Sequence, residues 1–198
     1  MSKLKIYQKE NPEENKVLRS ISEEIPQNEI TSSENQKLID DMTYFLEVQP
    51  DGAALAAPQV GVNKRLFIVS PHIFSAVGRK IESADDLVFI NPEIIKTSKK
   101  SKQMDEGCFS VRYWYGDVKR STNITISAFN KKGVKKTWGA GGILAQVFQH
   151  EIDHLDGILF CDKAKNLEKM SQAKIDQLTK ERKQMEKERN AEKKVSKK

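Results

Sequence analysis

The segment ILAQVFQHEIDHL, residues 143–155, decides how this chain folds. Its apolar residues recur every three or four positions, which predicts an amphipathic helix with one face in a core. Gly157 follows where a glycine commonly ends a helix. His150 and His154 are four residues apart, so the helix would bring both imidazoles to one face, within reach of a single cation.

The two histidines belong to an H-E-x-x-H motif. Its glutamate, Glu151, lies close enough to them to exchange a proton with a water beside a metal ion. Two histidines on a helix can also be ordinary surface residues. Against that alternative, Ile152 and Leu155 give the same helix an apolar side, and the motif contains two of the 3 histidines in the chain. The segment therefore predicts a metal site.

A third ligand has to come from elsewhere, because catalytic zinc-type sites normally have three protein ligands and one open position. Downstream, Asp156, Asp162 and Glu168 are available, but none stands in a recognisable pattern. Upstream, Cys108 in the segment DEGCFS, residues 105–110, is the better candidate. A lone cysteine is more often a small buried apolar residue. Here the flanking Glu-Gly pair and the incomplete histidine site favour a ligand.

Outside these segments, helix and strand patterns alternate along the chain. Expected elements are a helix at 34–48, strands at 65–69, 87–90, 94–103 and 123–129, and a return strand at 134–138. Residues 1–30 are expected to be an extended arm and residues 71–86 a loop. From residue 166 onward we expect a basic helix, ordered at its start and frayed at its end.

The positive charge is concentrated at the end of the chain. The 198 residues carry a net charge of +6, but residues 163–198 hold 13 Lys and Arg against 6 Asp and Glu. The preceding part is close to neutral, so the basic character says little about it. The length suits one domain with a real core. We expect a catalytic domain at 1–165 and a basic, partly disordered tail at 166–198.

Composition also bears on the compartment. No apolar stretch approaches the roughly 20 residues that span a bilayer, and the first residues lack the apolar run of a secretory signal. We therefore expect a cytoplasmic protein with no membrane partner. In a reducing compartment the two cysteines, Cys108 and Cys161, are not expected to form a disulfide.

Three segments resemble, in the same order, the three motifs of the peptide deformylase family. Residues 52–59, GAALAAPQ, resemble its glycine-rich first motif. Residues 106–110, EGCFS, are similar to the second motif, which is usually EGCLS, and residues 149–154, QHEIDH, match the third, QHExDH. The likeness covers roughly residues 4–165. Three motifs in order are far more specific than any one of them.

The resemblance implies an α+β fold in which antiparallel strands wrap a central helix carrying H-E-x-x-H, with a basic helix at the C-terminus. It implies one divalent metal ion held by Cys108, His150 and His154. Fe²⁺ is the common ion of the family in the cell, and Zn²⁺, Ni²⁺ or Co²⁺ can replace it. The implied activity is removal of the N-formyl group from N-formyl-methionyl nascent peptides, with release of formate.

The resemblance also implies roles for single residues. Glu151 would accept the proton of the attacking water. The side-chain amide of Gln59 and the backbone N–H of Phe109 would donate to the formyl oxygen. Glu106 is expected to orient Gln59 or the Cys108 loop. Arg120 is expected to pair with Asp153 and so steady the metal-binding helix.

Substrate contacts are expected on both sides of the metal. The candidates are Gly52, Ala53, Ala54 and Leu55 as a strand edge for the peptide, Gly107 beside the cysteine, and Gln146 and Val147 in the methionine pocket. Three aromatic residues could equally rim that pocket or belong to the core: Phe109, Trp114 and Tyr115.

Two departures from the family pattern bear on substrate preference and rate. Ala54 stands where the first motif usually has a second glycine, and its methyl group could crowd the peptide or forbid a positive φ. Arg112 follows Ser-Val where the family usually has proline.

Two other functions are compatible with parts of this pattern. A general zinc endopeptidase would place its third ligand after His154. A divergent, ribosome-associated binding module would keep the fold with weak or no activity. The basic tail itself has three interpretations: a solvated helix, a contact to ribosomal RNA at the ribosome, where deformylases act, or non-specific affinity for nucleic acid.

Overall fold

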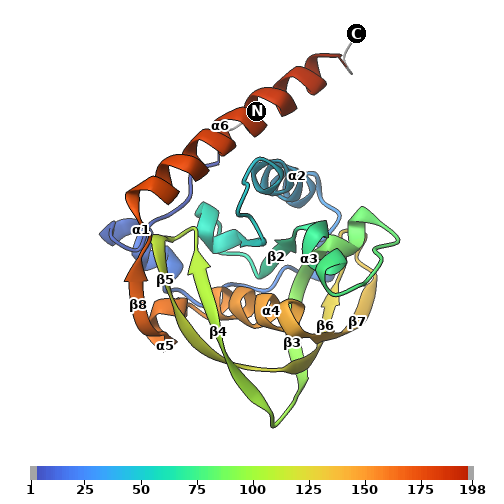
Figure 1. Ribbon diagram of the computed structural model, residues 1–198. Helices are drawn as coiled ribbons and strands as arrows, with labels where there is room; N and C mark the ends of the chain where they lie inside the picture. Colours follow the sequence, from blue (N-terminus) through green and yellow to red (C-terminus); the bar gives the residue numbers. More distant parts are fainter. Residues whose placement is uncertain (1–3, 196–198) are drawn as a thin grey trace.

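The computed structural model describes residues 4–195, in which two antiparallel sheets enclose a helix (Figure 1). The helical segments are α1 (Pro12–Leu18), η1 (Gln27–Glu29), α2 (Ser33–Glu47), η2 (Ala57–Val60), α3 (Pro71–Ala76), η3 (Ala84–Leu87), α4 (Gly142–Leu155), α5 (Phe160–Lys163) and α6 (Gln172–Val195). The strands are β1 (Ala54–Ala56), β2 (Leu66–Val69), β3 (Val88–Thr97), β4 (Ser101–Cys108), β5 (Val111–Ser121), β6 (Asn123–Phe129), β7 (Lys135–Gly141) and β8 (Lys165–Lys169).

The larger sheet has the order β1-β2-β3-β6-β7 and the smaller one β4-β5-β8. In β6 the apolar residues Ile124, Ile126 and Ala128 alternate with more polar ones and are buried, as expected for a strand with one face in the core. In the smaller sheet, β4 and β5 form a long hairpin that runs from the Ser101–Ser121 pair to the Cys108–Val111 pair. The hairpin turn therefore lies directly after Cys108.

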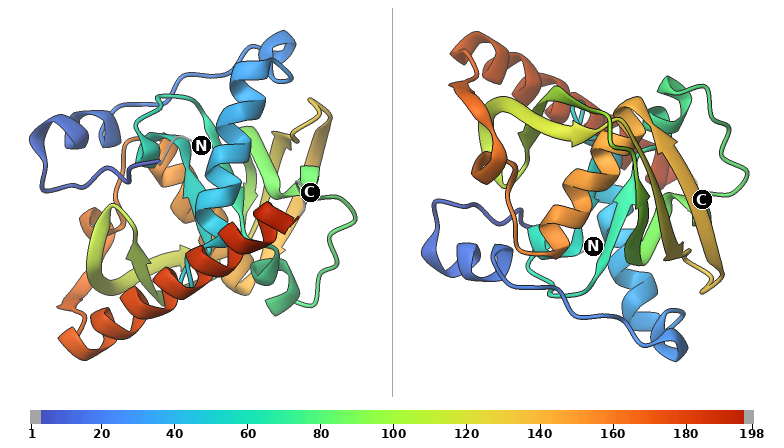
Figure 2. Two further views of the ribbon diagram at one scale, coloured as in Figure 1. Left: turned by 90° about the horizontal axis from the view of Figure 1, so that it is seen from above. Right: turned by 90° about the horizontal axis from the view of Figure 1, so that it is seen from below.

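Helix α4 lies between the two sheets, as the view from below in Figure 2 shows. Its apolar side, with Leu144, Phe148 and Ile152, joins the largest core cluster beneath the five-stranded sheet. The ring centroids of Phe148 and Phe89 are 4.8 Å apart. Full burial of such a side chain contributes about 1.5–3 kcal/mol to folding. The predicted α+β architecture, with antiparallel strands around the H-E-x-x-H helix, is confirmed.

Gly157 ends this helix for a steric reason. Its φ is +73°, and a Cβ atom at this position would lie 2.4 Å from the carbonyl oxygen of Arg19. A side chain would meet both a left-handed backbone and a fixed carbonyl, so only glycine fits.

The structure has two short helices, one near the N-terminus and one after β2, that the sequence did not predict. Residues 1–30 were expected to be an extended arm, but α1 forms there because Asn11 accepts hydrogen bonds from the backbone of Glu13 and Glu14, and Pro12 occupies the first turn. The expected loop at 71–86 begins with α3, again with proline in the first turn. Both helices are too short to show a periodic apolar pattern.

The C-terminal segment begins differently from the expectation. Residues 165–169 form β8, which pairs with β5, and the helix starts only at Gln172. Figure 1 shows α6 leading away from β8 across the top of the molecule. Leu178 is buried against the body, with 7% of its surface exposed. The partial disorder expected of the tail remains a prediction, and residues 196–198 lie outside the described part. None of the described helices is both long and apolar enough to cross a bilayer.

Candidate metal centre

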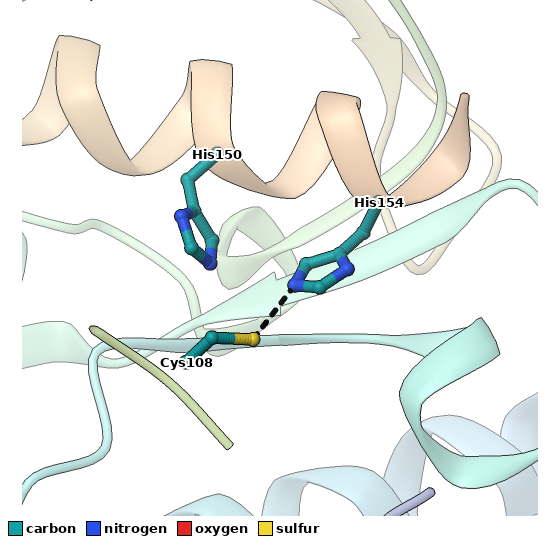
Figure 3. Close-up of side chains that lie close together, drawn as sticks. All are labelled: Cys108, His150 and His154. Atoms are coloured by element: carbon teal, nitrogen blue, oxygen red, sulfur yellow. Dashed lines mark hydrogen bonds between the residues drawn. The ribbon is translucent and has the colours of Figure 1, made fainter. Parts of the chain in front are cut away.

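Three side chains with metal-binding atoms converge between α4 and the β4–β5 hairpin. Cys108 comes from the end of β4, and His150 and His154 come from successive turns of α4 (Figure 3). Their ligand atoms all lie within 4.8 Å of one another, and Cys108 Sγ is 3.1 Å from His154 Nε2. The structure therefore brings together the three residues that the family resemblance assigned to the metal.

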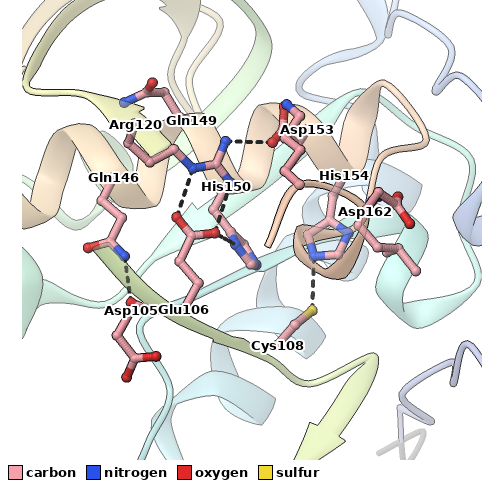
Figure 4. A network of polar contacts seen from close by, with 12 residues as sticks. Asp105, Glu106, Cys108, Arg120, Gln146, Gln149, His150, Asp153, His154 and Asp162 are labelled. Carbon is pink, nitrogen blue, oxygen red and sulfur yellow. Dashed lines mark hydrogen bonds and ion pairs between the residues drawn. The ribbon is translucent and has the colours of Figure 1, made fainter. Parts of the chain in front are cut away.

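Glu106 fixes the orientation of His150. Its Oε2 is 2.9 Å from His150 Nδ1, which leaves the other ring nitrogen, Nε2, free to bind a metal ion. Arg120 donates two hydrogen bonds, of 2.7 and 2.8 Å, to the carboxylate of Glu106. Its Nη1 donates a third to Asp153 Oδ2 at 2.6 Å. Figure 4 shows this chain of charges linking β4, β5 and α4. Glu106 thus contacts Arg120 and His150, and no hydrogen bond joins it to Gln59 among the described residues.

The charges around Glu106 set its protonation state. Burial opposes ionisation of its carboxyl group, but the hydrogen bonds and charges of Arg120 and His150 outweigh burial and lower the pKa of Glu106 to about 2. The ionised carboxylate of Glu106 can accept hydrogen bonds from Arg120 and His150 at the same time.

The Cys108 sulfur is surrounded by groups that favour a thiolate. Burial of the thiol opposes ionisation, but the nearby His154 and His150 hold the pKa of Cys108 well below its ordinary value. The backbone N–H of Ser110 points at Sγ from 3.4 Å, and Gln59 Nε2 does so from 3.3 Å. A thiolate is the form of cysteine that binds metal ions.

Glu151 lies in the same cavity without a fixed partner. It is 4% exposed, and its Oε2 has no hydrogen-bond partner among the described residues. Burial is the main reason that the pKa of Glu151 is raised to about 7. A carboxyl group with such a pKa can both take up and release a proton near neutral pH.

Gln59 is held in place by the backbone of the first motif. Its Oε1 accepts from Ala56 N at 2.8 Å, which turns Nε2 toward Cys108 Sγ and Ser110 Oγ. Phe109 occupies the hairpin turn next to Cys108 and lines the same cavity. The amide of Gln59 is therefore fixed on the metal-binding side of the cavity.

A cavity of about 220 Å³ leads from Glu151 and His150 to the surface. Among the predicted substrate residues, Ala53, Ala54, Gly107, Gln146 and Val147 line it. Gly52 and Leu55 do not line it: Leu55 is fully buried, and Gly52 packs against Leu46. Trp114 and Tyr115 line the cavity, and Phe109 lines it while also belonging to a core cluster.

Ala54, which lines the cavity, does not have the positive φ that an alanine would tolerate poorly. In the described part of the chain, the positive-φ residues other than glycine are Asn91, Tyr113 and Asn166. Ala54 has an ordinary strand backbone, so the expected conflict with a positive φ does not arise. Ala54 belongs to the main core cluster and also lines the cavity.

The donor set fits a first-row divalent metal ion. One thiolate and two imidazoles make a three-ligand set of the kind that leaves a position open. The partnerless Oε2 of Glu151 borders the same space. Of the three carboxylates considered downstream, Asp156 pairs with Arg65 and Asp162 with Arg19, and Glu168 lies on the exposed strand β8, outside the group of ligands.

Sequence analysis gave no role to two residues of the site. Ser110 donates its backbone N–H to the Cys108 sulfur and lies beside Gln59. Gln149 ties α4 to the end of β5, because it accepts from Ser121 N and donates to Ser121 O, each at 3.0 Å. Both residues lie inside recognised motifs, which was the available signal.

Comparison with known proteins matches this geometry. Residues 4–170 match the model of the family described as polypeptide deformylase. The chain belongs to the polypeptide deformylase family. A peptide deformylase of Symbiobacterium thermophilum is 46% identical over 69% of this chain, and the match spans 58% of that protein's length. For a peptide deformylase of Halothermothrix orenii the identity is 44%, over 74% of this chain and 86% of the other.

Solved deformylase structures share the fold. A class I type b peptide deformylase from Acinetobacter baumannii, crystallised with Met-Ala-Ser bound, superposes with a TM-score of 0.68 at 28% identity, over 82% of this chain and 98% of the other. The deformylase family is metal-dependent, and this chain has a Cys-His-His group able to bind the ion. The matches support a deformylase enzyme, and they do not favour an inactive binding module or a general endopeptidase.

Proposed function

We propose that this chain hydrolyses the N-formyl group of N-formyl-methionyl peptides and releases formate, using a metal ion held by Cys108, His150 and His154. The observation that carries the proposal is the meeting of these three ligands with the buried, partnerless carboxyl of Glu151 in one cavity. A divalent ion in this position would act as a Lewis acid and lower the pKa of water.

The residues around the metal ligands supply the remaining chemistry. Glu151 accepts the proton of the attacking water and later returns it to the departing amine, a shuttle that a pKa near 7 suits. Gln59 Nε2 and the backbone N–H of Phe109 donate to the formyl oxygen as negative charge builds there. One such donor lowers the barrier by about 3 kcal/mol.

The substrate chain would lie along the first motif. β1 is an edge strand of the larger sheet, and small residues at Ala53 and Ala54 let a peptide backbone approach it. The methionine side chain would enter beside Val147 and Gln146. Neither Gly52 nor Leu55 lines the cavity, so any contact of theirs with the peptide would be through the backbone.

The identity of the ion is a finer proposal. A thiolate with two imidazoles suits several first-row metals, and the preference for Fe²⁺ over Zn²⁺, Ni²⁺ or Co²⁺ rests on the family resemblance. A formate-release assay on formyl-Met-Ala-Ser tests activity and ion together. It is run anaerobically with Fe²⁺ and then with Ni²⁺, beside Cys108→Ala. Activity that needs one of these ions and Cys108 supports the proposal, and no formate with either ion would overturn it.

The tail carries a separate proposal about location. Residues 163–198 have a net charge of +7, which favours contact with ribosomal RNA and a cytoplasmic place of action beside the nascent chain. Co-sedimentation with ribosomes at low and high salt tests this for the full chain and for a chain ending at Leu178. We expect salt-sensitive binding that truncation removes, with unchanged turnover of the short peptide. Equal binding by both chains would refute it.

A further inference from the structure

Arg112 occupies an unusual position at the mouth of the cavity. It follows the hairpin turn, one residue into β5, and its side chain lines the cavity that holds Glu151. Its guanidinium carbon lies 5.1 Å from the ring centroid of Phe109 and 5.1 Å from that of Tyr113. Two rings therefore hold the charged group by cation–π contact, with 21% of the side chain exposed.

Stacking on ring faces leaves the N–H groups at the edge of the guanidinium available. Arginine has five such donors in a fixed plane, yet no hydrogen bond from them to another described residue is present. The nearest carboxylate, Asp51, is 3.7 Å away, which is an ion pair beyond hydrogen-bonding distance. The guanidinium of Arg112 is therefore held in place by the two rings, and its N–H donors have no hydrogen-bond acceptor within the described part of the chain.

The backbone is distorted at the same place. Tyr113 has a φ of +68°, a left-handed conformation that is uncommon for a bulky residue. The other two non-glycine residues with positive φ in the described part of the chain are Asn91 and Asn166, and asparagine tolerates this conformation well. The conformation brings the Tyr113 ring against the guanidinium. Strained backbone that serves a side chain in a cavity wall is typical of functional segments.

Arg112 and Asp51 lie side by side in the lining of the cavity. Asp51 directly precedes the segment whose Ala53 and Ala54 line the same cavity. A peptide whose formyl group lies at Cys108 must leave this cavity with the residues that follow methionine. Farther along β4, Asp105 also lines the cavity, opposite Asp117 in the sheet, so the positive group of this rim is Arg112.

We propose that Arg112 is a specificity-determining residue that selects peptides with an acidic side chain at the second or third position. The inference rests on the proposed deformylase function. A substrate carboxylate offers two in-plane acceptors to the free edge of the guanidinium, whereas a lysine there meets a like charge. Asp51 competes for the same guanidinium and repels the incoming carboxylate, so it moderates the preference.

Peptide series with matched variants test the proposal. The value of kcat/KM is measured on formyl-Met-Ala-Ser, formyl-Met-Asp-Ser, formyl-Met-Ala-Asp and formyl-Met-Lys-Ser. For the unmodified chain we expect the better acidic peptide to exceed the lysine peptide by roughly tenfold, the size of one hydrogen bond to a charged group. Arg112→Ala should bring this ratio near one, Arg112→Lys should keep part of it, and Asp51→Asn should raise it.

Arg79 offers a matched control. Its guanidinium also stacks on a ring, 5.2 Å from Trp138, but it lies outside the cavity and donates to Gly139 O at 2.7 Å. Arg79→Ala should leave the ratio unchanged. A structural role for Arg112 would instead lower kcat/KM equally for all four peptides, and that result would overturn the proposal.

Product binding gives a readout that does not depend on turnover. Trp114 lines the cavity and is 37% exposed, whereas Trp138 is buried, so tryptophan fluorescence reports on the cavity. Titration of the metal-loaded protein should give tighter binding of Met-Asp-Ser or Met-Ala-Asp than of Met-Lys-Ser, a difference that Arg112→Ala removes. Equal affinities in the unmodified chain would overturn the proposal. If no formyl peptide is hydrolysed, the proposed function fails, and this titration still decides the role of Arg112.

Discussion

Cys108 and Glu151 border the same cavity, but their surroundings shift the two pKa values in opposite directions. N–H donors and two imidazoles surround the sulfur and favour its charged form. The carboxyl of Glu151 is buried and one of its oxygens is partnerless among the described residues, which favours its neutral form. Separate environments for two neighbouring acids let one bind a cation while the other moves a proton.

Replacing Glu151 with glutamine tests this division at the residue scale. Glu151→Gln keeps the size of the side chain but cannot take up a proton, so formate release should fall by about 100-fold or more. Metal content per chain, measured by atomic absorption, should stay the same, because Glu151 is not among the three ligands. The control is Glu168→Gln, on the exposed strand β8, which should keep full activity. Loss of metal in Glu151→Gln would contradict this assignment.

A second residue-scale prediction concerns Glu106. Glu106→Gln keeps one acceptor for His150 but removes the charge that holds both the imidazole and Arg120. Loss of such a supporting carboxylate typically weakens metal binding by about 10- to 100-fold. Competition with a chromophoric chelator measures the change. An unaltered metal affinity would mean that Glu106 serves only the fold.

At the residue scale, the parts of the site that could be predicted from the sequence are those carried by a local motif. The ligands were identifiable because a helix fixes the geometry of residues four apart, and family motifs supplied Cys108. The partners of Glu106 could not be read from the sequence, because Arg120 and His150 meet it only after a hairpin and a helix have packed together. Arg112 also stacks on Tyr113, a residue with a positive φ that no residue pattern predicts.

At the scale of elements, Arg120 joins β5 to both β4 and α4. It is 4% exposed and bonds Glu106 and Asp153, two carboxylates on different elements. Arg120→Leu would leave both carboxylates buried without their main cation. We expect a loss of about 3–5 kcal/mol in the free energy of unfolding, measured by urea denaturation. Lys163→Ala removes only an outer partner of Asp153 and should cost far less. Equal effects would show that the buried network contributes little.

Asp86 ties η3, which precedes β3, to the β6–β7 hairpin through a charge whose effect on stability depends on pH. Burial of Asp86 opposes ionisation, but hydrogen bonds from Asn130 and Lys136 outweigh it and lower the pKa of Asp86 below its ordinary value. A lowered pKa in the folded state adds stability above the unfolded pKa of about 4. This stability is lost as the pH falls through the lower folded value.

The variant Asp86→Asn isolates that contribution. Near pH 6 it should be less stable than the unmodified chain by about 1–3 kcal/mol, as for a hydrogen-bonded charge. The difference should shrink as the pH falls from 5 to 3, because only the unmodified chain has a carboxylate to protonate. Urea midpoints measured over this range check the sign. A difference that is constant with pH would rule out ionisation as its cause.

Long elements were predictable and short ones were not, for a physical reason. The helix expected at 143–155 is observed at Gly142–Leu155, and the strand at 123–129 has its expected bounds, because many periodic residues agree. The helix α1 depends on one capping asparagine, and β8 on pairing with β5 far away in the chain. The strand expected at 87–90 and the start of the one expected at 94–103 form a single strand, β3, with an irregularity at Asn91, whose φ is +48°.

For the whole molecule, the site joins two layers that otherwise have separate cores. Cys108 packs with the small cluster that includes Leu18, Val111 and Phe160, whereas Ile152, which lies between the two histidines on α4, belongs to the main core. A metal ion bound by Cys108, His150 and His154 would therefore hold the β4–β5 hairpin against α4. Such binding stabilises only the folded chain, so it shifts the unfolding equilibrium.

Metal removal should consequently lower the thermal stability of the entire chain. With free metal at 1,000 times its dissociation constant, the gain over the chelated protein should be about 4 kcal/mol. Calorimetry with and without a chelator measures this difference. Cys108→Ala should abolish most of it, whereas Cys161→Ala should retain it, because Cys161 lies outside the group of ligands. If the chelated and loaded proteins melted at the same temperature, or if both cysteine variants lost the gain equally, the three residues would not form a metal-binding link between the layers.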